Sequence, residues 1–441
     1  MDGLEAVLAD VLTREREEAL PHAERPPRSR AFHLLQRRDF RLAYGAIATS
    51  ELGDAFQYIA LMWFALEAGG PVGVLVVRLA DSVPALLFGL HGGLVADRFE
   101  RRRTMIAADL LRGAVLVPVA IAGLAGHLPL WGLVLAAFIL TAATSYFDPA
   151  YGALLPALVE RENVQQANAL VRASADAIGV GGWALAAGLL IFIPLSALFA
   201  VNAATFFVSA ALIARICARP AAAVAEGTSW AQTREGLAAL RLLPVLAVAV
   251  VVLGIAITIE SGTWMVGVPE LVRSELGHEA GGFALVMMGY AVGSIAGGIY
   301  LARRPVRRKA YASLLAWSLY LPAYLLMGLA GVLSVAVLGA FCAGLGQGSS
   351  VVLLHSAAQQ DVPDNVLGRV MGLINLVHRG AHATGLIFVS PLFAFFSPRP
   401  IFVAAALAAP IVGIGGAVVA LALSRRGGEA RGRAASRSPR S

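Results

Sequence analysis

The chain has 441 residues, of which 58% are hydrophobic and only 14% are charged, whereas a soluble domain carries about 25% charged residues. A water-soluble globular protein is therefore excluded. The hydrophobic residues suffice for roughly a dozen membrane-spanning helices of about 20 residues each. They lie in continuous runs rather than in the alternating segments of a lipid-facing barrel strand, so an outer-membrane barrel is excluded as well. The composition predicts an all-α membrane protein.

Continuous apolar runs, divided at glycine, proline and charged clusters, predict twelve transmembrane helices in chain order. They cover residues 41–65, 74–96, 104–126, 129–153, 168–192, 195–217, 243–268, 281–302, 310–330, 333–357, 370–396 and 400–424.

The basic residues indicate the side of the membrane on which each loop lies. Of the 35 Lys and Arg residues, 29 lie on the side shared by both termini and two, Arg273 and Arg399, lie on the opposite side. By the positive-inside rule both termini are cytoplasmic. The predicted location is the inner (cytoplasmic) cell membrane. The net charge of +7 is explained by this topology without a nucleic-acid partner.

Three segments recur in the second half of the chain, in the same order. Residues 49–53 (TSELG) recur as 258–262 (TIESG) at an offset of 209, and Gly92-Gly93 recurs as Gly297-Gly298 at an offset of 205. Residues 159–164 resemble 362–366, at offsets of 203 and 202 for the two ends. Repeats in transporters place the substrate site at their interface. They predict two pseudo-symmetric six-helix bundles, at 41–217 and 243–424.

The segments outside these bundles are more polar. Residues 1–40 are a predicted cytoplasmic arm, in which 4–12 either lies on the membrane surface as an amphipathic helix or stays loosely ordered. The linker 218–242 carries Trp230, Leu237 and Leu240 at helical spacing. This spacing suits a helix on the membrane surface, and the alternative is again a loosely ordered segment. The basic tail 425–441 is predicted to be disordered and to be attracted by anionic lipid headgroups.

A charged motif, GLVADRFERRR, lies at 93–103 between the second and third predicted spans. It resembles the signature loop of the major facilitator superfamily, Gly-x-x-x-Asp-Arg-x-Gly-Arg-Arg, although Glu100 stands where that pattern has its second glycine. The resemblance implies inter-helix contacts that hold the cytoplasmic side shut when the cavity faces outward. The residues at the matching positions are Gly93, Asp97, Arg98, Arg101 and Arg102.

Further segments, at 147–150, 155–170 and 362–372, resemble the branch of drug:proton antiporters that contains the macrolide and enterobactin exporters. The likeness covers about residues 38–424. It implies a secondary active transporter that exports amphipathic small molecules, either drugs or specialised metabolites, by alternating access and in exchange for protons. Two alternatives on the same scaffold are an exporter dedicated to one siderophore or metabolite, and a lipid or lysolipid flippase.

Other classes of protein have little support in the sequence. No Ser/His/Asp grouping or Walker phosphate loop indicates an enzyme or direct use of ATP. The two cysteines, Cys217 and Cys342, are neither a disulfide framework nor a metal-ligand set. His378 and His382 are four residues apart, and we expect them to pack or to hydrogen-bond rather than to bind a metal. We therefore expect a monomeric transporter without metal or cofactor.

Ionised side chains within membrane spans are costly, so each is a candidate functional group unless it is paired. Three pairs have the spacing that places opposite charges on one helical face. They are Arg78 with Asp81, Asp109 with Arg112, and Arg172 with Asp176. We interpret all three as structural ion pairs.

Three acids have no such neighbour, namely Glu51 and Asp54 in the first span and Glu260 in the seventh. In the superfamily fold the first, fourth, seventh and tenth spans line the central cavity, so the resemblance implies that these acids face one another there. Burial disfavours a charged carboxylate, which allows the acid to load a proton on one side and release it on the other. We expect Asp54 to carry the coupled proton, with Glu51 and Glu260 assisting. The alternative is a buried hydrogen bond or an ion pair with a distant partner such as Arg379.

Aromatic side chains in the spans are candidates for the substrate cavity, because a ring can stack on a substrate or bind a cationic centre. The candidates are Tyr58, Trp63, Phe138 and Trp264, together with the basic Arg379. Since acids outnumber the one basic candidate, the predicted substrate is lipophilic or amphipathic and not strongly anionic.

Overall fold

The computed structural model describes residues 33–160, 163–217, 230–304 and 306–435, and its regular structure there is entirely helical. In chain order the elements are η1 (Leu34–Gln36), α3 (Arg38–Arg98), α4 (Arg101–Leu124), α5 (Leu130–Leu154), η2 (Leu155–Leu158), α6 (Val164–Leu189), α7 (Ala197–Ala214), α8 (Trp230–Arg241), α9 (Pro244–Glu270), η4 (Leu271–Glu275), α10 (Ala280–Arg303), α11 (Lys309–Ala316), η5 (Trp317–Leu319), α12 (Tyr320–Gly328), α13 (Leu333–Asp361), α14 (Asp364–Phe388), η6 (Ser390–Ala394) and α15 (Pro398–Ala435).

The first two predicted spans lie in one long element, α3, which turns sharply in its middle. Gly69 and Gly70 are not helical, and Gly70 has φ of +59°, a conformation that L side chains rarely adopt. Pro71 then begins the second helical part, where its fixed φ suits the first turn. A turn of two residues therefore replaces the longer loop expected at 66–73.

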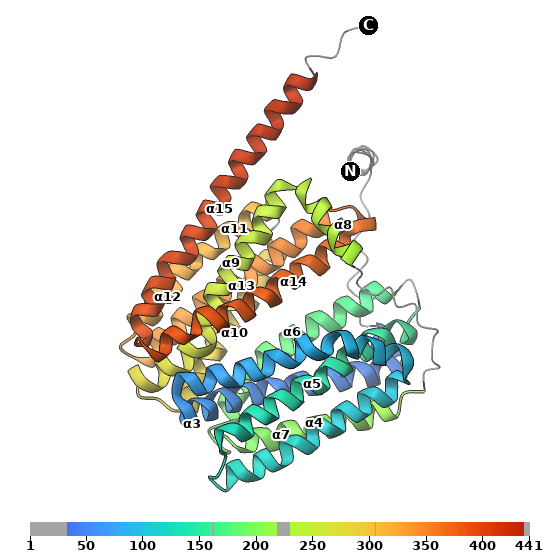
Figure 1. Ribbon diagram of the computed structural model, residues 1–441, viewed down its shortest axis with the longest axis vertical. Helices are drawn as coiled ribbons and strands as arrows, with labels where there is room; N and C mark the ends of the chain where they lie inside the picture. Colours follow the sequence, from blue (N-terminus) through green and yellow to red (C-terminus); the bar gives the residue numbers. More distant parts are fainter. Residues whose placement is uncertain (1–32, 161–162, 218–229, 305, 436–441) are drawn as a thin grey trace.

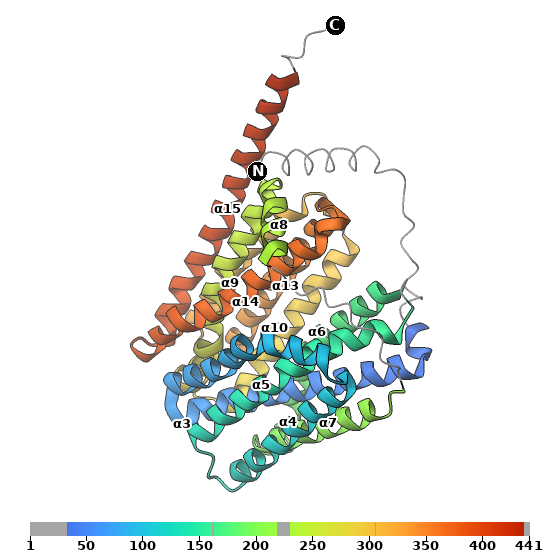
Figure 2. The same ribbon diagram turned by 45° about the vertical axis from the view of Figure 1, so that its right-hand side comes forward.

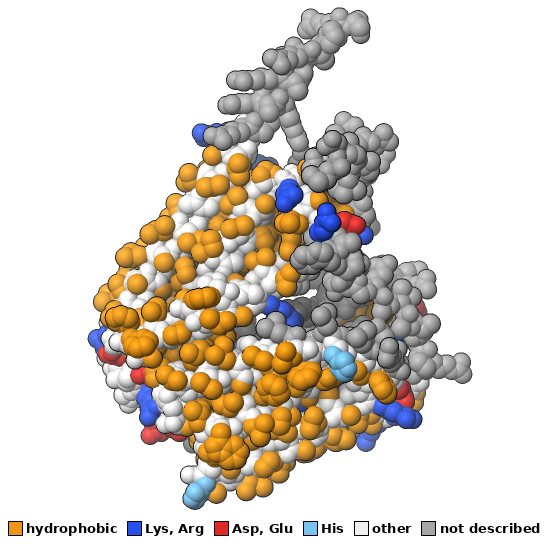
Figure 3. Space-filling view, viewed as in Figure 1, with side chains coloured by type: hydrophobic (Ala, Val, Ile, Leu, Met, Phe, Trp, Pro, Cys, Tyr) orange, Lys and Arg blue, Asp and Glu red, His pale blue; other side chains and the backbone are white. Residues whose placement is uncertain are grey.

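The helices form two groups, which are visible in both ribbon views (Figures 1 and 2). Elements α3 to α7 pack against one another, and so do α8 to α15. The groups contact each other mainly through α6 with α10 and α3 with α9. They diverge toward the end of the molecule where α3 begins and α8 lies (Figure 2), and the space-filling view shows a hollow between them (Figure 3).

Glycines recur every four residues at 289, 293 and 297, a spacing that predicts close packing of neighbouring helices. A Cβ at Gly293 of α10 would lie 2.0 Å from the carbonyl oxygen of Phe341 on α13, and one at Gly344 of α13 would lie 1.9 Å from that of Tyr290. A contact that close requires the two backbones to separate. Glycine is therefore required at both positions for the observed approach of α10 and α13.

Nine helical stretches in the described part of the chain are long and apolar enough to cross a membrane. The all-α, multi-span prediction is confirmed. One of the nine, Arg38–Pro84, includes the Gly69-Gly70 turn. Helix α14 is not among them, because Asn375, His378, Arg379 and His382 lower its mean hydropathy.

The helix that Trp230, Leu237 and Leu240 indicate in the linker is present as α8, whereas the tail is more helical than predicted. Helix α8 packs against α14, where Arg369 pairs with Glu235 at 2.5 Å and the backbone passes close to Gly236. Helix α15 continues to Ala435, past the predicted start of disorder at 425. Residues 1–32, 218–229 and 436–441 lie outside the described residues.

Candidate functional site

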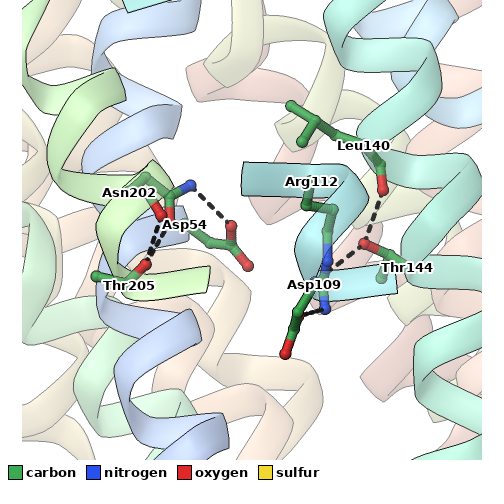
Figure 4. A network of polar contacts seen from close by, with 7 residues as sticks. All are labelled: Asp54, Asp109, Arg112, Leu140, Thr144, Asn202 and Thr205. Carbon is green, nitrogen blue, oxygen red and sulfur yellow. Dashed lines mark hydrogen bonds and ion pairs between the residues drawn. The ribbon is translucent and has the colours of Figure 1, made fainter. Parts of the chain in front are cut away.

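A polar cluster lies inside the first group of helices, around Asp54 of α3 (Figure 4). The side-chain amide of Asn202 on α7 donates hydrogen bonds to Asp54 Oδ1 at 3.2 Å and to Gln57 Oε1 at 2.7 Å. Asn202 is fully buried, yet Asp54 is exposed. The Asp54 carboxylate therefore borders a water-accessible space among the helices. Gly53 allows α7 to come this near, because a Cβ there would lie 2.0 Å from Asn202 Oδ1.

The predicted pair Asp109 and Arg112 on α4 forms the opposite side of this cluster (Figure 4). The two side chains form an ion pair, and they are 0% and 3% exposed. The Arg112 guanidinium also lies over the rings of Phe147, at 4.5 Å, and Phe206, at 4.4 Å. Asp109 Oδ2 has no hydrogen-bond partner within the described residues. This confirms the ion pair and places it in a desolvated environment.

Glu260 of α9 lies in a separate environment inside the second group. Its side chain is 4% exposed, and Oε2 has no hydrogen-bond partner in the described part of the chain. It interacts electrostatically with the tyrosines at 290, 320 and 324 and with Tyr58 of α3. The buried hydroxyls of Tyr320 and Tyr324 also lack partners there.

Asp54 and Glu260 have different surroundings in this state, and the joint role of the three acids in a central cavity stays a prediction. Asp54 accepts a hydrogen bond from Asn202 of α7, whereas Glu260 lies near tyrosines of α3, α10 and α12. Gly53 packs against Asn202 of α7, and Gly262 packs against Gly385 and Val389 at the end of α14. Glu51 is half-buried and Arg379 is exposed. Glu260 and Arg379 do not pair.

The sequence repeat is visible in the backbone around these acids. Thr49 Oγ1 donates to the carbonyl of Gly45 at 2.7 Å, and Thr258 Oγ1 donates to that of Gly254 at 2.9 Å. All of these residues are related by the same offset of 209. Glu51 and Glu260 thus occupy equivalent positions on equivalent helices, although their surroundings differ.

Six aromatic side chains form a continuous bridge between the two groups of helices. Tyr58 of α3 lies 5.7 Å from Trp183 of α6 and 6.4 Å from Phe283 of α10, measured between ring centroids. Trp63 also packs on Phe283, and Tyr290 links Trp183 to Trp264. We call this set, Tyr58, Trp63, Trp183, Trp264, Phe283 and Tyr290, the aromatic bridge.

The aromatic bridge changes the role expected for two candidate cavity residues. Trp63 and Trp264 are each 3% exposed, so neither presents a ring face to an open cavity in this state. Tyr58 is half-buried and its hydroxyl contacts Met265 Sδ at 3.3 Å. Phe138 packs edge-on against Phe88, away from the bridge. Packing between hydrophobic rings at the junction of the two groups explains why the tryptophans are covered.

The signature motif is described only in part. Gly93, Asp97 and Arg98 belong to α3, but their side chains lie outside the described residues. Arg101 Nη1 donates to the carbonyl of Ala153 at 2.8 Å, and Arg102 donates to that of Ala214. These carbonyls are at the C-terminal ends of α5 and α7, where a cation is favoured. Both arginines thus tie helices of the first group together in this state.

Other predicted polar contacts have mixed outcomes. Arg78 donates to Asp81 Oδ2 at 2.6 Å, as predicted, and Thr141 donates to the other oxygen of Asp81. The ring Nε2 atoms of His378 and His382 are 3.1 Å apart, a hydrogen bond in which one ring is the donor. This agrees with the expected hydrogen-bonding role. The side chains of Arg172 and Asp176 lie outside the described residues.

Several residues in these environments were not predicted, namely Asn202, Thr144, Tyr290, Tyr320, Tyr324 and Gln347. A signal existed for some of them. Asn202 is an amide in the middle of an otherwise apolar helix, and Tyr320 and Tyr324 are four residues apart on one face. No local signal connects Tyr290 with Gln347, whose side chains form a hydrogen bond between α10 and α13.

Among proteins of known sequence, the chain resembles several bacterial transporters. It is 25% identical over 178 residues to the uncharacterised MFS-type transporter YvqJ of Bacillus subtilis, covering 40% of this chain and 42% of that protein. It is 29% identical over 126 residues to macrolide efflux protein A of Streptococcus pyogenes, covering 28% and 31%. The matches thus span less than half the length of these relatives.

Solved structures share the fold at low sequence identity. An auto-inhibited peptide transporter of the POT family aligns with a TM-score of 0.64 and 13% identity, over 86% of this chain and 96% of that one. The nucleoside transporter NupG aligns with a TM-score of 0.61 and 14% identity, over 88% and 99%. A family model described as Major Facilitator Superfamily matches residues 44–386. This chain therefore belongs to the major facilitator superfamily of secondary transporters.

Proposed function

We propose that this transporter exports amphipathic small molecules, drugs or specialised metabolites, in exchange for protons. The observation that carries the proposal is the state of Glu260, a membrane-embedded carboxylate with an unpartnered oxygen and 4% exposure. Burying an uncompensated charge costs several kcal/mol. Binding a proton removes that cost, so occupation of this group by a proton is coupled to its burial.

Asp54 is the second coupling group, and Glu51 assists it. Asp54 borders a water-accessible space, accepts a hydrogen bond from Asn202 and lies opposite the Asp109 and Arg112 pair. Water access provides a route for a proton, and the nearby arginine competes with that proton for the carboxylate. The two acids therefore serve as one accessible and one enclosed proton site.

Export of an amphipathic substrate is supported by the partial similarity to macrolide efflux protein A and by the residues between the two groups of helices. Arg379 and Asn375 are exposed on α14, and Tyr58 and Arg78 are half-buried on α3. Arg78 also lies over the Tyr58 ring, 5.9 Å from its centroid. Ring faces with few charges suit a largely apolar substrate.

The proposal includes twelve spans in two bundles, at 41–217 and 243–424, with both termini in the cytoplasm of a cell whose inner membrane holds the protein. Helix α3 contributes two spans because it turns at Gly69-Gly70, and α11, η5 and α12 together contribute the ninth. The 29 to 2 division of basic residues supports the sidedness. The signature motif, Asp97 included, closes the cytoplasmic side in the opposite state.

The aromatic bridge and Arg273 join the two groups on the side away from the termini, where Arg273 Nη1 donates to the carbonyl of Leu66 at 2.6 Å. These contacts support a state that is closed to the outside and open to the cytoplasm. Opening the outer side requires the bridge to separate, which is the conformational change that alternating access needs.

The test is transport in proteoliposomes with and without an imposed pH gradient, using a panel of cationic, neutral and anionic amphiphiles. We expect gradient-driven transport of cationic and neutral compounds by the wild type. Asp54→Asn and Glu260→Gln should abolish the stimulation by the gradient, while gradient-free exchange of substrate continues. Glu51→Gln should weaken the stimulation.

Glu279→Gln is the matched control, because Glu279 is an exposed acid in the loop before α10 and should behave as wild type. Full gradient dependence in both Asp54→Asn and Glu260→Gln would refute proton coupling through these acids. Preferential transport of polyanions would refute the substrate class.

A further inference from the structure

A groove of about 510 Å³ lies between α11 and α15, on the outer surface of the second group of helices. Its walls are mainly apolar and include Leu315, Ile414 and Val418, which are 51%, 49% and 61% exposed. The two helices touch beneath it, since a Cβ at Gly413 would lie 2.6 Å from the carbonyl oxygen of Leu314. The groove is therefore a formed depression with a closed floor, within the range of ligand-site volumes.

One end of the groove is basic. Arg308 lines it and is exposed, as is the more distant Arg425. Arg425 follows Leu421, another lining residue, by one helical turn on the same face of α15. Within the described residues no carboxylate pairs with Arg308, and neither 306–316 nor 398–425 contains an acidic residue. The positive charge at this end is uncompensated.

The apolar walls of the groove and its basic end are arranged as the interior and the surface of a membrane require. The groove follows two helices with exposed hydrophobic side chains, and Figure 3 shows such side chains along the α15 face with Lys and Arg side chains toward its upper end. Tyr311 marks the boundary, because its ring lines the groove while its hydroxyl bonds the α15 carbonyl of Ala420 at 3.3 Å and Ser424 Oγ at 3.2 Å. An apolar trough thus ends at a cationic site near the membrane surface.

We propose that this groove binds one anionic phospholipid, with an acyl chain against Leu315, Ile414 and Val418 and the phosphate at Arg308. A lipid is the occupant whose chemistry fits both parts, since it is apolar along its length and negative at one end. A second copy of this chain fits less well. Related by a twofold axis along the membrane normal, it would bring its own basic end to the same depth as Arg308, and the like charges would repel. The site lies on the outer surface of the molecule and does not depend on the proposed coupling acids.

The experiment is native mass spectrometry of the purified, delipidated full chain after addition of phosphatidylglycerol or phosphatidylcholine with identical acyl chains. We expect one tightly retained phosphatidylglycerol and weaker retention of phosphatidylcholine. Arg308→Gln should weaken retention of phosphatidylglycerol about fivefold, the factor expected for one basic side chain at an anionic headgroup. Val418→Trp should reduce retention of both lipids by filling the groove.

Two neighbours provide matched controls. Arg307→Gln removes an exposed arginine that does not line the groove, and Val419→Trp adds the same ring at a 50% exposed position outside the lining. Both should retain phosphatidylglycerol as the wild type does. Equal loss in Arg307→Gln and Arg308→Gln, or equal retention of the two lipids by the wild type, would overturn the proposal. Competition by glycerol phosphate as strong as by the lipid would show a free phosphate site instead.

Discussion

The Asp109 and Arg112 pair allows a quantitative test of how charges are accommodated inside the first group of helices. Removing one member of a buried ion pair leaves the other charge uncompensated, which costs about 3–5 kcal/mol. We expect this loss of unfolding free energy for Arg112→Gln, because the Asp109 side chain is 0% exposed and one of its oxygens already lacks a partner.

The reverse substitution should be milder. In Asp109→Asn the guanidinium of Arg112 still lies over the Phe147 and Phe206 rings, and each desolvated ring contact is worth up to about 2 kcal/mol. A loss of about 1–3 kcal/mol is therefore expected. The double variant has no buried charge at this place, and such replacements are often close to neutral. It should be more stable than Arg112→Gln alone.

The measurement is unfolding of the four purified proteins in a denaturing detergent titration, combined as a double-mutant cycle. Transport by the double variant, measured with and without a pH gradient, then tells a structural pair from a coupling pair. A structural pair predicts that gradient-driven transport survives in the double variant. Additive losses, or an Asp109→Asn variant less stable than Arg112→Gln, would show that the buried pair does not stabilise the protein as argued.

The remaining predictions concern packing, state and sidedness. Gly293→Ala should lower the melting temperature in detergent and cost about 1–3 kcal/mol by overpacking against α13. Gly298→Ala should leave the melting temperature unchanged, because nothing lies within 4 Å of a new Cβ there. Equal melting temperatures of the two variants would contradict the close approach of α10 and α13. Tyr58→Ala should shift spin-label distances across the outer side toward the open state. Tyr58→Phe keeps the ring in the aromatic bridge and should leave these distances unchanged. Unchanged distances in both variants would exclude the aromatic bridge as a gate. With Cys217 and Cys342 replaced, an impermeant thiol reagent should label Ser274→Cys but not Ser436→Cys in intact cells, and the reverse pattern would invert the topology.

Features that depend on neighbours in sequence could be predicted. The pairs Arg78 with Asp81 and Asp109 with Arg112 follow from the pitch of the helix, and the close approach of α10 to α13 follows from glycines spaced by four. The repeated Thr and Glu positions in α3 and α9 could also be found, because the offset of 209 is constant around them.

Features that depend on how helices are rotated against one another could not be predicted from the sequence. The hydrogen bond that Asp54 accepts from Asn202 joins residues 148 positions apart, and no local pattern around Asp54 indicates it. Trp63 and Trp264 were expected to line a cavity, yet rings from α6 and α10 cover the junction. Hydrophobic runs reveal that a helix spans the membrane and contain little information on which face meets which neighbour.

The two halves thus use one backbone pattern for two chemical environments. The threonine bonds at Thr49 and Thr258 are repeated, and so is the acid two residues later, but the surroundings diverge. In the first half a hydrogen-bond donor, Asn202, and an arginine, Arg112, lie beside the acids, so a charged carboxylate has partners there. Around Glu260 the described residues include several tyrosines, and the hydroxyls of Tyr320 and Tyr324 have no hydrogen-bond partner. A neutral acid can remain buried there, whereas a charged one is costly to bury, and this difference is the basis of the proton coupling proposed for Glu260.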